Sequence, residues 1–232
     1  MPGQDITISG RDGDFSAYLA APAGGQGPGI VVIQEIFGVN AVMRAIADDL
    51  AAEGYFALAP DLFWRLEPGI QLTDRSDAEW QRAFGLMQRF DIDKGVEDIQ
   101  SAIDHLRVTP GASGKVGTVG YCLGGQLAYL AATRSDCDAS VGYYGVMLQD
   151  RLTEAANITA PLMLHIAGED EFTPPPARDK VIAGLKDNPH VTLYVYPGMD
   201  HAFARVGGAH YDQAAADLAN VRTRDFFRAH LG

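Results

Sequence analysis

The sequence predicts a single α/β domain over residues 1–232, with a mostly parallel central sheet, helices on both faces and an N-terminal antiparallel hairpin. Short runs of apolar, often β-branched residues alternate along the chain with longer stretches of helical spacing, which is the pattern of strands and crossover helices. The chain of 232 residues is also long enough for one such domain with a sizeable core, and no linker, repeat or low-complexity tract divides it.

The N-terminal strands are indicated by local patterns. Residues Ile6–Ser9 and Phe15–Leu19 are expected to pair as the hairpin, and the Gly/Pro-rich segment Ala21–Gly29 is expected to turn the chain toward the next strand. The run "GIVVI", Gly29–Ile33, is continuously apolar. Such a run suits a strand that is buried on both faces of a parallel sheet.

A βαβ unit is predicted around the first helix. The helix is expected over Asn40–Glu53, with Asn40 capping its start and Gly54 ending it. Apolar residues recur every four positions on one face of this helix: Val42, Ile46 and Leu50. The following strand is expected over Tyr55–Pro60, which completes the unit.

The same alternation continues to the C-terminus. The further strands are expected at Lys115–Val119, Ser140–Tyr144, Leu162–Ala167 and Val191–Tyr196. The further helices are expected at Asp77–Arg89, Asp93–Arg107, Gly124–Ala132, Ala177–Leu185 and Tyr211–Ala229. Ligand sites of such sheets lie beyond the carboxyl ends of the strands, so residues that follow a strand are the candidates for function.

Charge and cysteine content restrict the class of partner. The formal net charge is −12 and no basic cluster stands out, which argues against binding nucleic acid or an anionic membrane. No signal peptide pattern is visible, and no apolar run approaches the roughly 18 residues of a membrane span. The two cysteines, Cys122 and Cys137, are too few for a disulfide framework, so a cytoplasmic location is expected.

The stretch "GTVGYCLGGQ" places Cys122 between two glycines, directly after one strand and before one helix. Cysteine is among the most buried residue types, so one interpretation is a small core residue. The alternative is a nucleophile on a sharp strand-to-helix elbow, where the helix N-terminus favours the thiolate. The strand–elbow–helix context favours the nucleophile.

A nucleophile needs a base, and the base needs a group that orients it. Asp170 follows the strand "LMLHIA", and His201 follows the strand "LYVY" after the break at Pro197 and Gly198. The order nucleophile, acid, histidine is that of the α/β-hydrolases. Other histidines are less well placed: His165 lies within its strand, His105 on a helix, and His190, His210 and His230 in surface positions.

The end of the first central strand, "QEIFGVN", offers two further groups. A developing oxyanion is usually held by backbone N–H groups, and the N–H groups of Ile36 and Leu123 are the expected donors. Glu35 lies between apolar residues at the strand end where the pocket is expected. It is interpreted either as a surface carboxylate or as a functional group, and the functional interpretation is favoured because a carboxylate here would be partly desolvated and costly unless paired.

These residues resemble the dienelactone hydrolase family of α/β-hydrolases. The resemblance is carried by "QEIFGVN", "GYCLGGQLA", "VGYYGV", "GEDEFTP" and "DHAFAR" and covers nearly the whole chain. It implies a triad of Cys122, Asp170 and His201. It also implies that Glu35 takes the proton of the resting thiol once a substrate carboxylate draws Arg205 away from it.

The sequence departs from the family pattern where the substrate carboxylate is held. The resemblance implies a second arginine and a tyrosine on the helix before "FD", but these positions are Trp80 and Phe84 here, and Arg82 lies on a different helical face. Ala202 stands where a small polar residue is expected. Because an indole does not replace a bidentate clamp, the substrate is expected to be less charged or more aromatic than a dienelactone.

The predicted function is hydrolysis of a lactone or carboxylic ester through a cysteinyl acyl-enzyme, with the carboxymethylenebutenolidase activity that the resemblance implies. Neither a metal nor an organic cofactor is expected. The protein is expected to be a monomer or a small homo-oligomer. The alternatives are a promiscuous carboxylesterase or thioesterase on the same site, and a non-catalytic binding protein of this fold. Four residues are the expected substrate contacts: Arg205, Trp80, Phe84 and Phe37.

Overall fold

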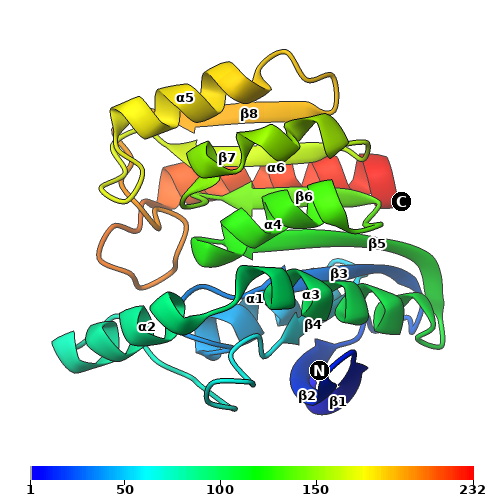
Figure 1. The fold of residues 1–232 in the computed structure, drawn as a ribbon. Coiled ribbons are helices and arrows are strands. Elements are labelled where there is room, and N and C mark those ends of the chain that lie inside the picture. The colour runs from blue at the N-terminus through cyan, green and yellow to red at the C-terminus, as the bar shows by residue number, and fades with distance from the viewer. Residues whose placement is uncertain (1) are drawn as a thin grey trace.

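A computed structural model describes residues 2–232, which form an eight-stranded sheet of order β1-β2-β4-β3-β5-β6-β7-β8 (Figure 1). The strands are β1 (Gln4–Gly10), β2 (Gly13–Ala20), β3 (Gly27–Ile33), β4 (Phe56–Pro60), β5 (Ala112–Tyr121), β6 (Ala139–Tyr143), β7 (Leu162–Ala167) and β8 (Val191–Tyr196). The helices are α1 (Ala41–Ala52), α2 (Asp77–Arg89), α3 (Ile92–Arg107), α4 (Leu123–Arg134), α5 (Pro175–Leu185) and α6 (Gln213–Leu231).

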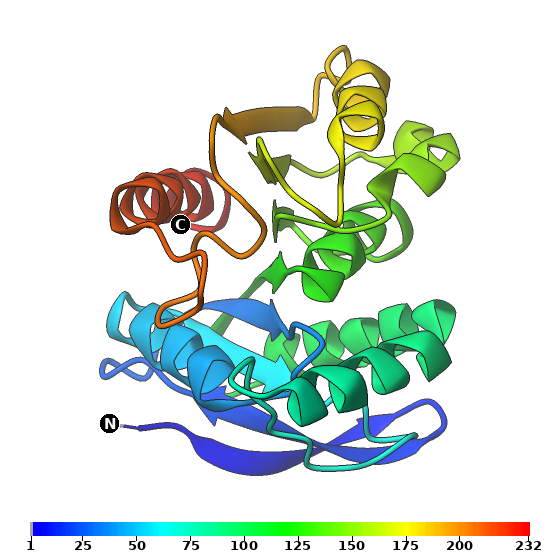
Figure 2. The same ribbon diagram turned by 90° about the vertical axis from the view of Figure 1, so that its left-hand side faces the viewer.

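The pairing of the strands confirms the predicted sheet. Strands β1 and β2 form an antiparallel hairpin, and β2 runs antiparallel to β4. Every pairing from β4 through β3, β5, β6 and β7 to β8 is parallel. Figure 2 shows α1 and α6 on one face of the sheet and α3, α4 and α5 on the other. The carboxyl ends of the parallel strands therefore meet along one edge, beside α2.

Burial of the central strands explains their sequence. The side chains of Ile30–Ile33 in β3 are fully buried, as expected for a strand covered by helices on both faces. None of the helices in residues 2–232 combines the length and the apolar composition that a membrane crossing requires.

Several element boundaries differ from the prediction, and side-chain caps explain two of them. Helix α3 begins at Ile92 because the Asp91 carboxylate accepts from the N–H groups of Asp93 and Lys94 at 3.0 and 3.1 Å. Helix α6 begins at Gln213 rather than Tyr211 because Asp212 caps it through the Ala215 N–H at 2.8 Å.

Glycine explains a third difference. Strand β5 extends over Ala112–Tyr121, well beyond the predicted Lys115–Val119, because its glycines interrupt the apolar pattern without breaking the strand. Two short 3₁₀ helices, η1 (Leu148–Asp150) and η2 (Leu152–Asn157), also follow β6 where no element was predicted.

Gly120 allows β5 to pass close to the start of α4, and we expect Gly120→Ala to destabilise the protein. A Cβ atom at this position would overlap the carbonyl oxygen of Gly124, a backbone atom that cannot move without shifting the helix. Overpacking of a rigid contact costs about 1–3 kcal/mol, so the free energy of unfolding in urea should fall by at least this amount.

Gly85→Ala is the matched control for this prediction. Gly85 lies inside α2, and a Cβ atom there would meet no heavy atom within 4 Å. Alanine in a helix interior is more favourable than glycine by about 0.5–1 kcal/mol, so this variant should be at least as stable as the parent protein. Equal changes in the two variants would contradict the close approach at the elbow.

Candidate active site

Cys122 occupies the sharp turn between β5 and α4. Its backbone has φ 57° and ψ −115°, a conformation that a residue with a Cβ atom rarely adopts. The turn is held from both sides, because the Cys122 N–H donates to the Tyr143 carbonyl at 3.1 Å and the Cys122 carbonyl accepts from the Gly125 N–H at 2.9 Å. The residue is 8% exposed and lines a pocket, so the sulfur is reachable from it.

His201 and Asp170 form a buried pair beside this turn. The two residues follow β8 and β7, and His201 Nδ1 lies 2.9 Å from Asp170 Oδ2. The other Asp170 oxygen accepts from the Phe172 N–H at 2.8 Å, which fixes the carboxylate. Among residues 2–232, His201 Nε2 has no hydrogen-bond partner, and both Cys122 and His201 line the pocket. The structure thus brings the three predicted residues to one site.

The surroundings of His201 act on its charge in opposite directions. Burial lowers the pKa of the ring, but the adjacent Cys122 sulfur and the hydrogen bond to Asp170 outweigh burial and raise the pKa of His201 above its ordinary value. Two aromatic rings, those of Tyr144 and Phe172, meet the imidazole edge to face, with centroids 5.1 and 4.8 Å away. These rings keep the imidazole in one orientation, and the sequence patterns did not indicate either of them.

Strained backbone is concentrated around this pocket. Within residues 2–232, the non-glycine residues with left-handed φ are Cys122, Tyr144, Met147 and Ala202. Three of them line the pocket or pack on its histidine, and Ala202 directly follows that histidine. A left-handed conformation costs about 1–2 kcal/mol for such residues, so the fold accepts strain to place these side chains.

Glu35 is buried at the end of β3, which excludes the interpretation as a surface carboxylate. The residue is 2% exposed, and neither of its carboxylate oxygens has a hydrogen-bond partner within residues 2–232. Burial raises the pKa of Glu35, while the charges of Arg205 and His201 act against this increase. The fully buried Gln34 positions the turn, because its amide donates to the Glu35 carbonyl at 3.3 Å and accepts from the Leu62 N–H at 3.1 Å.

Arg205 lies between two carboxylates. Its Nε atom is 3.4 Å from Glu35 Oε2, and its Nη1 atom is 3.1 Å from Asp74 Oδ2. The guanidinium also lies over the Phe37 ring, 5.1 Å from its centroid. The predicted pairing of Arg205 with Glu35 is present, whereas Asp74, which follows no strand, was missed by sequence reasoning.

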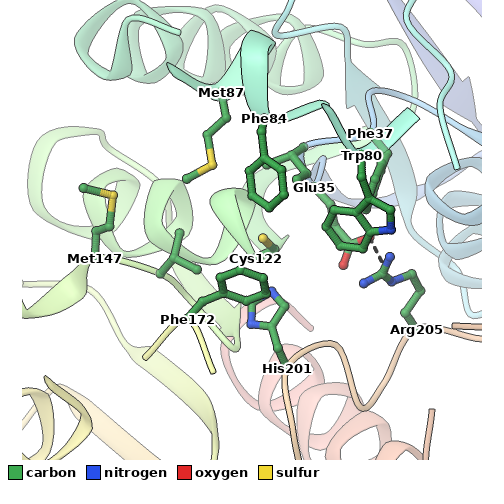
Figure 3. Close-up of a pocket in the computed structure, with 12 residues that line it drawn as sticks. Glu35, Phe37, Trp80, Phe84, Met87, Cys122, Met147, Phe172, His201 and Arg205 are labelled. Carbon is green, nitrogen blue, oxygen red and sulfur yellow. Dashed lines mark ion pairs between the residues drawn. The ribbon is translucent and has the colours of Figure 1, made fainter. Parts of the chain in front are cut away.

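The pocket has a volume of about 210 Å³ and a largely apolar lining (Figure 3). Trp80 and Phe84 reach it from α2 as predicted, and their rings stack with centroids 5.5 Å apart. Arg82 lies on the exposed side of the helix, paired with Glu67. The further apolar contacts come from Ile36, Phe37, Met87, Val146, Met147 and Phe172.

The two predicted oxyanion donors border the same space. Ile36 lines the pocket, and its N–H donates no hydrogen bond within residues 2–232. Leu123 is the first residue of α4, so its N–H has no acceptor inside the helix. Their role in holding an oxyanion stays a prediction.

The rival residues lie elsewhere. His165 is fully buried in β7 with both ring nitrogens hydrogen-bonded, to Tyr196 and Thr223, and burial lowers its pKa to about 3. Cys137 is 4% exposed, and burial raises the pKa of its thiol to about 11. The part of the chain that the structure describes holds no group of three or more His, Cys, Asp or Glu side chains arranged to bind a metal ion.

In the α/β-hydrolases, a strained strand-to-helix elbow lies at the carboxyl edge of a mostly parallel sheet, and an acid and a histidine follow it along the chain. This chain has the same arrangement and the same fold. The model of the "Dienelactone hydrolase family" matches residues 15–231. The chain therefore belongs to the dienelactone hydrolase family and is a hydrolase.

Individual relatives agree with this assignment over nearly the full length. A protein of Azospirillum brasilense is 54% identical over 233 residues, covering 98% of this chain and 99% of the relative. The carboxymethylenebutenolidase of Pseudomonas putida is 42% identical and covers 96% of this chain and 95% of its own. A Klebsiella pneumoniae crystal structure superposes with a TM-score of 0.87 at 25% identity, covering 97% and 98% of the two chains.

Proposed function

We propose that this hydrolase cleaves a lactone or carboxylic ester through an acyl-enzyme on Cys122. The observation that carries the proposal is the placement of Cys122 on a strained elbow in the same pocket as the buried His201–Asp170 pair. The Pseudomonas putida relative is named for the hydrolysis of a lactone, which supports the same class of substrate. A small molecule also suits the pocket volume of about 210 Å³.

The proposed reaction proceeds in two halves. Glu35 accepts the thiol proton, and the Cys122 sulfur attacks the substrate carbonyl while the N–H groups of Ile36 and Leu123 bind the oxyanion. The C–O bond then breaks, the oxygen of the leaving group takes a proton from His201, and a thioester remains on Cys122. His201 next removes a proton from water, which attacks the thioester; the acid leaves, and the Cys122 sulfur takes back the proton held by Glu35. Asp170 keeps the imidazole in the required tautomer.

Trapping of the acyl group tests this proposal. After rapid mixing with p-nitrophenyl acetate and acid quenching, we expect the intact protein to gain the mass of one acetyl group, located on Cys122 by peptide mapping. An acetyl group that accumulates only on another residue would contradict the role of Cys122. Absence of turnover with esters, lactones and thioesters alike would favour the alternative of a non-catalytic binding protein, whereas preference for thioesters would favour a thioesterase.

The binding partner, the location and the oligomeric state of the enzyme are also part of the proposal. The net charge of −12 supports a small-molecule partner over nucleic acid or an anionic membrane. A cytoplasmic location and a monomeric or small homo-oligomeric state stay predictions, and so does a reaction that requires no metal or organic cofactor.

A further inference from the structure

Arg205 is the one lysine or arginine in the pocket lining of residues 2–232, so it is the group that a substrate carboxylate would need (Figure 3). Arginine binds carboxylates well because its guanidinium donates two parallel hydrogen bonds. Whether the site favours a charged or a neutral substrate therefore depends on whether other groups of the protein already bind this guanidinium.

The guanidinium is already occupied by carboxylates of the protein. Its hydrogen bond goes to Asp74, at 3.1 Å between Nη1 and Oδ2. The contact with Glu35 is looser, at 3.4 Å from Arg205 Nε, and it is not a hydrogen bond. The side chains are only 10% exposed for Arg205 and 17% for Asp74, so water screens the pair weakly. One positive charge thus faces two negative charges, and Arg205, Glu35 and Asp74 together have a net charge of −1 when both acids are ionised.

Asp74 is held in place by the segment that leads into α2. Its carbonyl accepts from the indole N–H of Trp80 at 3.0 Å. The preceding residue, Thr73, is fixed to the Glu79 carboxylate by its N–H at 2.9 Å and its hydroxyl at 2.8 Å. The same tryptophan that makes the pocket apolar therefore also anchors the backbone of the acid that pairs with Arg205.

Asp74 acts from outside the pocket. It borders a second hollow of about 110 Å³, which it shares with Phe37 and Arg205, and it is not part of the lining of the larger pocket. Arg205 consequently separates Asp74 from the space in which the substrate would lie. The Asp74 carboxylate therefore acts on the substrate through the guanidinium, whereas its backbone carbonyl holds the Trp80 indole.

We propose that Asp74 is a positioning residue that sets specificity: by occupying and neutralising Arg205, it makes the pocket select neutral esters or lactones with an apolar or aromatic acyl group over carboxylated ones. This inference rests on the proposed hydrolysis of esters or lactones at Cys122. An incoming carboxylate would have to displace Asp74 from the guanidinium and approach the negative charge of Glu35. A neutral acyl group meets no such repulsion and packs on Trp80, Phe84 and Phe172.

The test compares two esters of nearly equal length, p-nitrophenyl hexanoate and mono-p-nitrophenyl adipate, of which only the second ends in a carboxylate. Wild-type protein should have the higher kcat/KM with the hexanoate ester. In Asp74→Asn, the adipate-to-hexanoate ratio of kcat/KM should rise about tenfold, the size expected when a charge-assisted hydrogen bond becomes available, and the change should come mainly from a lower KM for adipate. Asp74→Glu, which keeps the charge, should restore the wild-type ratio.

Asp77→Asn is the matched control, because it removes the same charge three residues further along the chain from an exposed side chain. Its ratio should equal that of the wild type. The proposal would be overturned if the wild type preferred the adipate ester, or if a folded Asp74→Asn kept the wild-type ratio. If the variant fails to fold, the wild-type preference between the two esters still tests the proposal. Hydrolysis that persists in Cys122→Ala would instead overturn the proposed mechanism, without bearing on the ratio.

Discussion

Cys122→Ala is expected to lower kcat/KM for ester hydrolysis at least about a thousandfold, because loss of the nucleophile leaves only binding and oxyanion stabilisation. Alanine keeps the Cβ atom, so the backbone of the elbow should not change, and the variant removes only a sulfur atom at the pocket wall. Steady-state hydrolysis of p-nitrophenyl acetate and of a lactone measures the loss, and thermal unfolding checks the fold. Turnover equal to that of the wild type would exclude Cys122 as the nucleophile.

Alkylation provides an independent check on the same residue. Iodoacetamide should inactivate the wild-type protein by labelling Cys122, because Cys122 lines the pocket, where the reagent can reach its sulfur. The control is Cys137→Ala, which should be inactivated at the same rate, since burial raises the pKa of Cys137 to about 11 and keeps that thiol protonated. Exclusive labelling of Cys137 would contradict the proposed site.

Glu35→Gln is expected to lower kcat about a hundredfold or more, the usual contribution of a general base. Glutamine has the same shape but cannot accept the thiol proton. Burial raises the pKa of Glu35, so the wild-type rate should fall as the pH drops below that raised pKa and the carboxylate becomes protonated. The variant should lose this acidic limb of the pH–rate profile, because it carries no proton acceptor at this position.

Stability separates this effect from damage to the fold. A carboxyl group whose pKa is raised in the folded state is destabilising when ionised, so at neutral pH the glutamine should keep or increase the free energy of unfolding. Glu171→Gln is the matched control, because Glu171 is exposed and flanks Asp170, and it should retain wild-type turnover. Turnover of Glu35→Gln equal to that of the control would show that Glu35 does not take part in the reaction.

Residues that follow strands could be predicted well from the sequence. Cys122 comes directly after a parallel strand, and Asp170 and His201 come within a few residues of the end of one. The carboxyl ends of such strands converge, so the meeting of the three residues at one edge follows from the alternation of elements. The same reasoning places Glu35 at the end of β3. Their chemical roles stay predictions until the variants are measured.

Residues whose place depends on irregular segments could not be predicted. Asp74 lies in a stretch without helical or strand periodicity and meets Arg205 across 131 positions of the chain, a contact that no local pattern records. The rings of Tyr144 and Phe172 reach His201 only because the turns after β6 and β7 fold over it. Sequence patterns predict regular helices and strands, whereas the course of such turns is determined by long-range packing.

The left-handed residues around the pocket have a consequence for how this enzyme tolerates change. Four such positions at about 1–2 kcal/mol each amount to a large part of the 5–15 kcal/mol by which a domain typically stays folded. Packing of the surrounding sheet must offset this cost in the free energy of folding. A mildly destabilising substitution in the distant hydrophobic interior should then first relax the turns of the active site, so that inactivation precedes global unfolding.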